Sequence, residues 1–525
     1  MCEKVLKNKK IFEKCLNYLD KETNEEQIVI LSRMFAQFAT KKHTGYFSSS
    51  FIEKKLIQVA ENIKTNIQKS DSYEEKSFLH VLSTAYITGG HTRVVERWIE
   101  NQDNKEKHSV LLLEQGSRDI PKKLKKFIEI KNGELIIFNN ENYIKKASML
   151  REFAQNYEYI ILHHHMYDPI PILAFGSTQT TRPVILFNHA SHLFWLGVSI
   201  ADIVADIMKT SQNLSINRRK VRKSLLLPIP IQENTEKINK IESRKKLNLP
   251  IDQKIILSIA APYKYKKFDK YDFIYAANTI IKNTQNTIFL VIGPNKNMLI
   301  DWNKAYKDSN NKIIALGLIP SNEIHNYIAS ADLYIDSFPV SSGTALLDAG
   351  MINNNILCLK TPHSNVDSVL EAGIQCETTA ELIDKAVKII NEETEFPNNL
   401  YENIKKYNSK ENWQKFLENI LKETPNKHSV DFLFKENTGI DEYDLFLNES
   451  LDDDNNIGFI DFDCFKKLNL KNKFFILNTL LFGYKVNNIS SYIKSFLPEK
   501  LKEKIKETQL YNLIKQFNKE QLSNE

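Results

Sequence analysis

The sequence is poor in cysteine, glycine and proline, and it contains no long apolar run. Its five cysteines are an odd number and form no CxxC pair, which argues against a disulfide framework and predicts a protein of the reducing cytoplasm. A membrane span needs roughly 18 uninterrupted apolar residues. The nearest approach, residues 474–484, includes Asn478 and Thr479. We therefore expect neither a disulfide-rich nor an integral-membrane protein.

The sequence also lacks an excess of charge of either sign. Lysine and arginine number 71 and aspartate and glutamate 65, which gives a formal net charge of +6 over 525 residues. A balance this weak does not favour nucleic acid as a partner. Hydrophobic residues make up 42% of the chain and charged residues 26%, as in soluble globular proteins. The length predicts roughly three or four domains.

Short apolar runs alternate with helix-length segments through the middle of the chain. Runs such as 159–162 and 254–259 are continuous and apolar, which is typical of strands in a parallel sheet with helices on both faces. The pattern predicts two Rossmann-like parallel-sheet domains facing each other across a cleft. The predicted divisions are a helical N-terminal extension (1–74), the first Rossmann-like domain (75–231), a linker (232–249), the second Rossmann-like domain with closing helices (250–425) and a mostly helical C-terminal extension (426–525).

The first candidate site follows the first predicted strand, in the segment Gly89-Gly90-His91-Thr92-Arg93. The two glycines permit a ligand to approach the backbone closely, and the start of the next helix offers N–H groups to a charged group. A histidine at this point titrates near neutral pH and suits a general base. The alternative is a plain turn from strand to helix with a histidine at the surface.

Histidines gather where the fourth and fifth predicted strands end, in His163-His164-His165-Met-Tyr-Asp168 and Asn188-His189-Ala-Ser-His192. A zinc site normally adds a cysteine or a carboxylate at a defined spacing, or places a histidine pair on a helix. Neither pattern is present, so we expect no metal ion. The residues expected to line the cleft on the acceptor side are His165, Asp168, Asn188 and His189.

The loop after the first strand of the second predicted domain is basic. Lys264 stands in the segment Ala261-Pro-Tyr-Lys-Tyr-Lys-Lys267. An ammonium group at the carboxyl end of a strand can neutralise a diphosphate leaving group without a metal. The alternative is a solvated basic loop.

The most informative string is Ala331 to Asp348, in which a predicted strand ends at Pro339 and Ser341-Ser342-Gly343-Thr344 opens a helix. Backbone N–H groups converge there and predict a cradle for an anion. Asp348 lies four residues after Thr344, on the same helix face, where a carboxylate can accept from two ribose hydroxyls. The alternative is an ordinary helix start with a solvated aspartate.

The two-sheet layout resembles the GT-B fold of nucleotide-sugar glycosyltransferases, and the second domain resembles the O-GlcNAc transferase-like group. The resemblance covers about residues 77–425. The matching segments are Gly90-His91, Arg182-Pro183 and Leu196-Gly197 in the first domain, and Ser258–Lys264, Leu316-Gly317, Ala331–Pro339 and Gly343–Asp348 in the second. Two positions depart from the group, since Gly343 stands where it has a histidine or another polar residue and Ala345 where it has its second threonine.

The resemblance implies a role for each matching residue. Asp348 would bind the ribose of a uridine nucleotide, Gly343 and Thr344 together with Ser342 would hold the diphosphate, and Lys264 would stabilise the leaving phosphate. His91, with Gly90 before it, falls where many inverting members place a catalytic or acceptor-positioning histidine. Retaining members carry two glutamates eight residues apart, but Val340 stands eight residues before Asp348, which favours inversion.

The implied activity is the transfer of a sugar, with inversion and without a metal cofactor, from a UDP-sugar to a glycan, a lipid-linked acceptor or a protein. Two alternatives remain: a UDP-sugar epimerase of the same fold, and a catalytically inactive GT-B-like binding or assembly protein. Residues 489–506 pair apolar positions with lysines, a pattern that permits peripheral contact with anionic lipid. The alternative for this segment is a helical subdomain packed on the protein or on a second copy, in a homo-oligomer.

Overall fold

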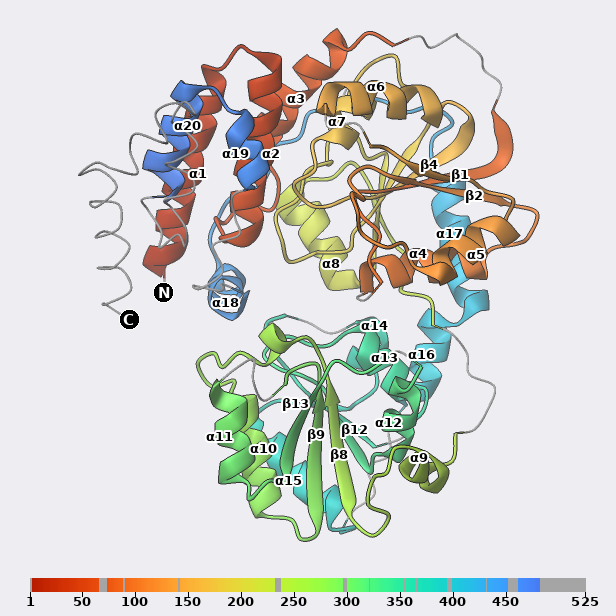
Figure 1. Ribbon diagram of the computed structural model, residues 1–525, viewed down its shortest axis with the longest axis vertical. Coiled ribbons are helices and arrows are strands. Elements are labelled where there is room, and N and C mark those ends of the chain that lie inside the picture. Colours follow the sequence, from red (N-terminus) through yellow and green to blue (C-terminus); the bar gives the residue numbers. More distant parts are fainter. Residues whose placement is uncertain are drawn as a thin grey trace, which may run out of the picture.

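The structure is a computed structural model that describes residues 2–65, 73–87, 90–139, 142–231, 238–295, 300–320, 322–353, 355–363, 366–393, 399–430, 432–451 and 461–481. Two α/β units lie one above the other in Figure 1, the first drawn in orange to yellow and the second in green. Helices α16 (Leu400–Asn408) and α17 (Lys410–Glu423) run along one side of both units.

The first domain is built on a seven-stranded sheet in the order β3-β2-β1-β4-β5-β6-β7, and every pairing is parallel. The strands are β1 (Glu74–Leu82), β2 (Lys107–Leu112), β3 (Leu135–Ile137), β4 (Tyr157–His163), β5 (Val184–Phe187), β6 (Ile203–Asp206) and β7 (Ser224–Leu226). Strands β5 and β6 are buried at every position. Such burial explains why the central strands are continuous apolar runs.

The second domain is built on a six-stranded parallel sheet in the order β10-β9-β8-β11-β12-β13. The strands are β8 (Lys254–Ile259), β9 (Thr287–Ile292), β10 (Ile313–Gly317), β11 (Leu333–Ile335), β12 (Ile356–Leu359) and β13 (Gln375–Cys376). The sequence predicts the first five and misses β13, which has only two residues. In both sheets the order reverses beside the first strand, between β1 and β4 and between β8 and β11, which is where ligands bind in open α/β sheets.

Helices connect the strands of both sheets. In the first domain they are α4 (Gly90–Asn101), α5 (Lys122–Ile130), α6 (Tyr143–Ala154), α7 (Ile170–Phe175) and α8 (Lys209–Leu214). In the second domain they are α10 (Phe273–Lys282), α11 (Ile300–Asp308), α12 (Ile324–Ser330), α13 (Thr344–Gly350), α14 (Asp367–Leu370) and α15 (Thr379–Ile390).

The polar stretch 232–249, predicted as a linker, contains helix α9 (Lys240–Lys246). Buried Arg244 of this helix donates to the Ser330 carbonyl at 2.9 Å and pairs with Asp332 at 2.6 Å. Lys240 of the same helix also pairs with Asp332. Two of the basic residues that made the stretch look like a linker therefore fix α9 to the second domain.

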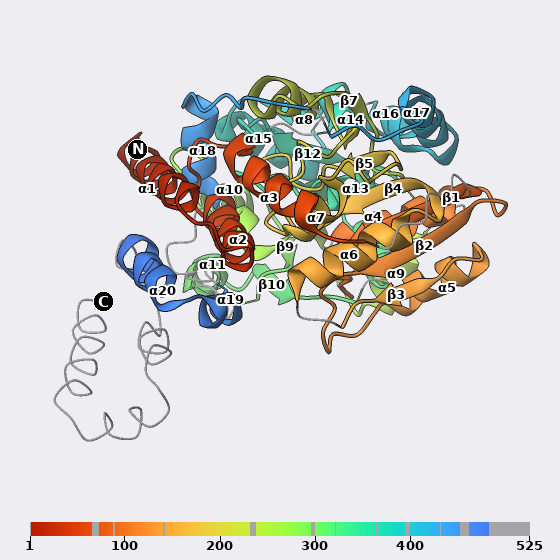
Figure 2. The same ribbon diagram turned by 90° about the horizontal axis from the view of Figure 1, so that it is seen from above.

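The N-terminal helices are α1 (Cys2–Asp20), α2 (Glu25–Lys41) and α3 (Ser50–Asn62). Their apolar side chains share one hydrophobic core with the first sheet and with α19 (Phe462–Lys467) and α20 (Leu470–Ile476). Tyr18 of α1 stacks on Phe475 at 3.6 Å between ring centres and donates to Asn472 at 2.7 Å. Figures 1 and 2 show these red and blue helices side by side. The predicted N-terminal extension is thus part of the first domain's core.

Helix α17 returns the chain to the first domain. Trp413 is fully buried, and its ring meets that of Trp98 in α4 edge to face at 5.7 Å. One helix earlier, Asn408 donates to the Ile229 carbonyl at 2.8 Å. The closing helices therefore brace the two domains from one side.

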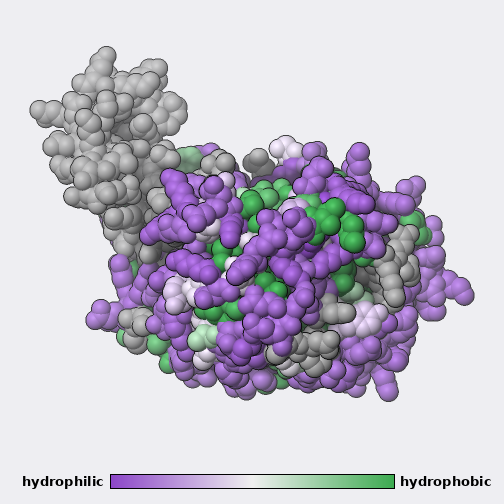
Figure 3. Space-filling view, turned by 90° about the horizontal axis from the view of Figure 1, so that it is seen from below, coloured by the Kyte–Doolittle hydropathy of each residue, from purple (hydrophilic) through white to green (hydrophobic). Residues whose placement is uncertain are grey.

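The segment from 432 leads into α18 (Glu442–Leu451), which lies between the domains in Figure 1. Buried Arg218 pairs with Asp444 at 3.0 Å and with Asp441 at 3.1 Å. Residues 489–506, with the basic amphipathic pattern, lie outside the described residues. Within the described residues no helix is both long and apolar enough to cross a bilayer. The face viewed in Figure 3 is mostly hydrophilic, with hydrophobic side chains in small patches.

Candidate functional site

Two contacts between the domains bound the candidate site. On one side, Arg97 of α4 pairs with Asp348 of α13 at 3.0 Å, and Arg93 lies 3.8 Å from the same carboxylate. On the other, the ring of His192, after β5, meets that of His363, after β12, edge to face at 5.0 Å. The carboxyl ends of both sheets therefore lie opposite each other across a narrow cleft.

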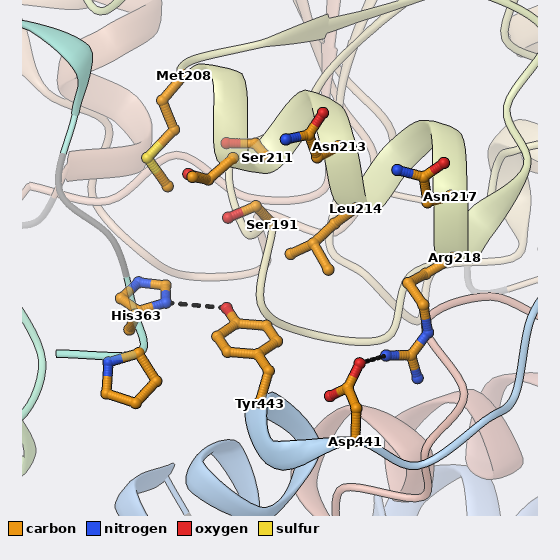
Figure 4. Close-up of a pocket in the computed structure, with 12 residues that line it drawn as sticks. Ser191, Met208, Ser211, Asn213, Leu214, Asn217, Arg218, His363, Asp441 and Tyr443 are labelled. Carbon is orange, nitrogen blue, oxygen red and sulfur yellow. Dashed lines mark hydrogen bonds and ion pairs between the residues drawn. The ribbon is translucent and has the colours of Figure 1, made fainter.

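A cavity of about 320 Å³ lies beside the His192–His363 contact. Figure 4 shows it between α8 above and α18 below. His363 Nδ1 and the Tyr443 hydroxyl lie 3.0 Å apart, and Arg218 pairs with Asp441 at 3.1 Å. The polar part of the wall includes Ser191, Ser211, Asn213 and Asn217. A cavity of this size with hydroxyl, amide and aromatic groups suits a small polar ligand.

Sequence reasoning missed this cavity. His363 follows the predicted strand 356–359. Because ligands bind at the carboxyl ends of the strands in open α/β sheets, this position could have been identified from the sequence. Tyr443 belongs to the C-terminal segment and Arg218 to the short π-helix Ser215–Arg219 that continues α8. No local pattern links these two residues to the cleft. Burial beside Lys264 lowers the pKa of His363 to about 4, so its ring is neutral at pH 7.

Lys264 lies in a short 3₁₀ turn, Pro262–Tyr265, directly after β8. Its Nζ donates to the carbonyls of Ser341 and Ser342 at 2.8 and 3.3 Å. Desolvation lowers the pKa of this ammonium group, and the nearby Asp336 carboxylate partly opposes that shift. The structure thus brings together Lys264 and the predicted anion cradle.

Asp336, at the end of β11, holds the cradle loop in place. Its carboxylate accepts from the Ser341 hydroxyl at 2.6 Å, the Ser342 hydroxyl at 2.5 Å and the Ser342 N–H at 3.1 Å. Gly343 follows with φ +66°, and a Cβ at this residue would meet nothing within 4 Å. A side chain there would have space but a strained backbone. Thr344 begins α13. Asp336 is a site residue that was not predicted from the sequence.

Asp348 faces the first domain. Its side chain is only 11% exposed and is held by Arg97, which also donates to the Pro230 carbonyl at 3.2 Å. The carboxylate predicted to accept from ribose hydroxyls is therefore already engaged between the domains. A nucleotide at this point would have to share it with Arg97 or displace that arginine.

His91 lies in the first turn of α4, after the exposed Gly90. Its ring centre is 4.2 Å from that of His189 and 6.2 Å from that of His165. Burial lowers the pKa of His91 and of His165 to about 4. The predicted base His91 and two of the predicted cleft residues, His165 and His189, are thus neutral imidazoles in one cluster, each able to accept a proton.

The structure gives two other predicted cleft residues a structural role. Asp168 is fully buried and accepts from the Ser83 hydroxyl at 2.5 Å and the Ile170 N–H at 3.0 Å, so it fixes the turn into α7. Asn188 is 1% exposed and donates to Asp206 at 2.7 Å, and it also lines a small cavity of about 20 Å³ beside His189. Polar residues at strand ends also serve to hold the following turn, and the sequence pattern does not separate that role from ligand binding.

The described residues contain no group of three or more histidine, cysteine, aspartate or glutamate side chains arranged to hold a metal ion. Among His163, His164, His165, His189 and His192, only one pair of rings is hydrogen-bonded together: His163 Nδ1 lies 2.8 Å from His189 Nε2.

Comparison with models of protein families and with curated protein sequences finds no match. Among solved structures, the chain is similar to a glycosyltransferase from Rickettsia africae, at 12% identity and a TM-score of 0.50 over 67% of this chain and 98% of that one. It is also similar to Anabaena HepE in complex with UDP and glucose (12% identity, TM-score 0.47, 66% and 99%). A third similar structure is the Thermobaculum terrenum O-GlcNAc transferase (9%, 0.46, 79% and 81%).

Two parallel-sheet domains joined by closing helices, together with the similarity to the Rickettsia structure, define the class of architecture. The chain has the GT-B fold, as its sequence predicts.

Proposed function

We propose that the protein is a glycosyltransferase that uses a nucleotide-sugar, with UDP-sugars as the preferred donors. The observation that carries this proposal is the presence of two chemical groups at the carboxyl ends of the two sheets: Lys264, bonded to the cradle loop of the second domain, and the neutral His91–His189 pair of the first. A cation that stabilises a leaving diphosphate and a base that takes a hydroxyl proton are the two groups that direct sugar transfer requires.

The residues divide the reaction between the domains. Two N–H groups of the Lys264 ammonium are directed at loop carbonyls, and a phosphate oxygen can accept from the third. The Gly343 N–H donates to the Ser341 hydroxyl at 3.3 Å in this structure, so a diphosphate would accept from it in place of that hydroxyl and from the Thr344 N–H beside it. The first domain supplies His91, which accepts the proton of the acceptor hydroxyl as the new glycosidic bond forms. The bond from the sugar to the diphosphate breaks in that step, and Lys264 stabilises the charge on the leaving oxygen.

The acceptor is proposed to reach the cleft through the cavity between α8 and α18. Its hydroxyl and amide groups suit the hydroxyls of a glycan, and the Tyr443 ring offers an apolar surface to a sugar face. A glycan, a lipid-linked sugar and a glycosylated protein segment all present such hydroxyls. We propose that the reaction inverts the anomeric centre and needs no metal, because Lys264 takes the place of a cation at the diphosphate.

Nucleotide binding tests the donor site. Wild type is expected to bind UDP in preference to GDP, CDP and ADP in calorimetry, and Lys264→Met to weaken UDP about tenfold or more, which is about 1.4 kcal/mol. The matched control is Lys267→Met, because Lys267 lies in the same loop but is exposed and pairs with Asp272. Lys264→Arg should retain most of the affinity. Absence of binding by every nucleotide would remove the proposed function.

Asp348 is tested by comparing the two sides of its ion pair. If the carboxylate accepts from the ribose, Asp348→Asn should weaken UDP about tenfold, while Arg97→Met should leave the affinity unchanged or raise it by freeing the carboxylate. Equal losses in both variants would instead assign the pair a purely structural role between the domains. Calorimetry with UDP gives both numbers, and thermal unfolding reports whether each variant is folded.

A further inference from the structure

Four histidines cross the core of the first domain in a hydrogen-bonded row. His108 Nδ1 lies 3.0 Å from His80 Nε2, His80 Nδ1 lies 3.1 Å from His163 Nε2, and His163 Nδ1 lies 2.8 Å from His189 Nε2. We call His108, His80, His163 and His189 the histidine row. Beyond its far end, the Glu106 carboxylate lies 3.8 Å from His108 Nε2.

The strand register produces this row. Phe78 of β1 pairs with His108 of β2, and Leu82 of β1 pairs with His163 of β4, so His80 stands midway between the two levels. Side chains two residues apart on a strand point to the same face. The rings therefore climb diagonally across the sheet toward its carboxyl edge. His189, two residues beyond β5, is the last ring and contacts His91 in the cleft.

The row is buried along its length, and a partly exposed residue stands at each end: Glu106 beyond His108, and His189 itself in the cleft. His80, His108 and His163 are fully buried, and the Trp98 ring covers His80 and His163 edge to face at 5.5 and 5.8 Å. The Glu106 side chain is 22% exposed. Burying an imidazole without hydrogen bonds costs about 1–3 kcal/mol, and the row offsets this because both nitrogens of His80 and of His163 are used.

Only two proton arrangements satisfy all three bonds. A neutral imidazole carries one N–H and one accepting nitrogen, so every ring in the row carries its proton either on Nδ1 or on Nε2. Both arrangements hold four protons. The first becomes the second when the row gains a proton at His108 Nε2 and loses one from His189 Nδ1. In the second arrangement, His108 Nε2–H points toward Glu106 and His189 Nδ1 is free of a proton.

We propose that the histidine row is a proton relay that connects the cleft with solvent at Glu106. The proposed function supplies the proton: when the acceptor O–H bond breaks, His91 accepts the proton. His91 and His189 are in ring contact at 4.2 Å between centres but are not hydrogen-bonded, so the proton reaches Nδ1 of His189, in a row that holds the second arrangement, across a water or a small ring movement. Each ring then passes its Nε2 proton to Nδ1 of the next, and His108 passes its proton to the Glu106 carboxylate, across a water or a small side-chain movement. No ring gains net charge at the end. The outward transfer leaves the row in the first arrangement. A proton that returns from Glu106 through the row to the diphosphate product restores the second, so each turnover moves one proton out and one back.

The groups around the row disfavour a state in which one ring keeps an extra proton. Lys131 faces His108, and His91, His164 and His165 face His189. Each of these disfavours a positive charge resting on the neighbouring ring, and burial acts in the same direction. A row that only filled the core would not need a carboxylate at its outer end or a ring in the cleft at its inner end.

Two variants interrupt the row at positions outside the cleft. Glu106→Gln removes the outer proton acceptor at a partly exposed position, and Glu134→Gln, directly before β3 and 60% exposed, is its matched control. His80→Phe interrupts the row in its middle while keeping an aromatic ring. With a UDP-sugar and an acceptor, we expect Glu106→Gln and His80→Phe to lower kcat about tenfold, with the UDP affinity unchanged, and added imidazole buffer to restore the rate of Glu106→Gln. Unchanged kcat in both variants would overturn the relay, and if His80→Phe does not fold, Glu106→Gln alone decides.

A second readout does not depend on turnover. In the full chain labelled with ¹⁵N at its histidine rings, nitrogen NMR distinguishes protons on Nδ1 from those on Nε2. The relay predicts that Glu106→Gln shifts the proton positions of all four rings, including His189 at the opposite end, whereas Glu134→Gln shifts none. A change confined to His108 would overturn the relay. This measurement needs no substrate. If the protein had no transferase activity, the proposed function would be wrong, and the NMR result would still decide the relay.

Discussion

Lowering the pH from 7.5 to 5 is expected to reduce the free energy of unfolding by several kcal/mol. The cause is a set of buried imidazoles that the fold keeps neutral. Burial lowers the pKa of His108 to about 3 and that of His91, His165 and His363 to about 4, and it also lowers the pKa of His80, His163, His189 and His192.

The direction follows from proton binding. An unfolded histidine has a pKa of about 6.5, so between this value and the lower folded pKa the unfolded chain binds more protons than the folded one. Stability is therefore complete above about pH 6.5 and falls as the pH drops toward the folded pKa. For a fully buried ring such as His108, the loss by pH 5 is about 2 kcal/mol. A single domain is stable by only about 5–15 kcal/mol, so a few such rings decide whether the first domain stays folded.

Urea unfolding at pH 7.5, 7, 6 and 5 measures this effect. The midpoint should change little between pH 7.5 and 7 and then decrease steeply, and His108→Asn should reduce the dependence by about 2 kcal/mol. A midpoint that stays constant from pH 7.5 to 5 would mean that the rings are solvated or paired with carboxylates in the folded protein, which would contradict the buried row.

Replacing His91 with alanine is expected to lower kcat by about 10²–10⁴-fold, the usual contribution of a general base, while UDP binding stays as in wild type. The ring lies in the first turn of α4 and contacts His189, so its removal takes away the base without touching the cradle loop or Lys264. Glu100→Gln on the same helix is the control, because it changes a charge of α4 away from the histidine cluster.

Steady-state rates with a UDP-sugar and calorimetry with UDP separate the possible outcomes. Loss of turnover with intact binding supports His91 as the base. Unchanged turnover would remove His91 from the reaction and leave His189 as the proton acceptor. A wild-type protein that binds UDP but transfers and hydrolyses nothing would be a binding protein of the GT-B fold.

The sequence predicts the architecture well because both sheets are parallel and buried. Each central strand is a continuous apolar run, as in 184–187 and 254–259, and such runs are recognisable without any partner strand. Strand β13 and helix α9 escape prediction for opposite reasons, since β13 is too short to form a run and α9 looks like a charged linker.

The site is predicted only in part, because its pieces meet through tertiary structure. The link between Lys264 and the Ser341–Ser342 loop follows from the rule that strand ends meet, and the sequence finds both halves. The pairing of Asp348 with Arg97 depends on how the two domains face each other. The histidine row depends on the strand order and register of β2, β1 and β4, without which His80 and His108 look like isolated polar residues in apolar strands.

The closing helix α17 and the pair α19–α20 have a consequence for the order in which the protein forms during synthesis. The ribosome makes residues 238–393 before Trp413, Phe465 and Ile476, which complete the core around the first sheet. The second domain holds all six of its strands by residue 376, so it can fold while the first still lacks its last buried side chains. The domain that starts first on the ribosome is thus expected to finish last, with the unburied faces of α2 and α4 exposed to chaperones in the interval.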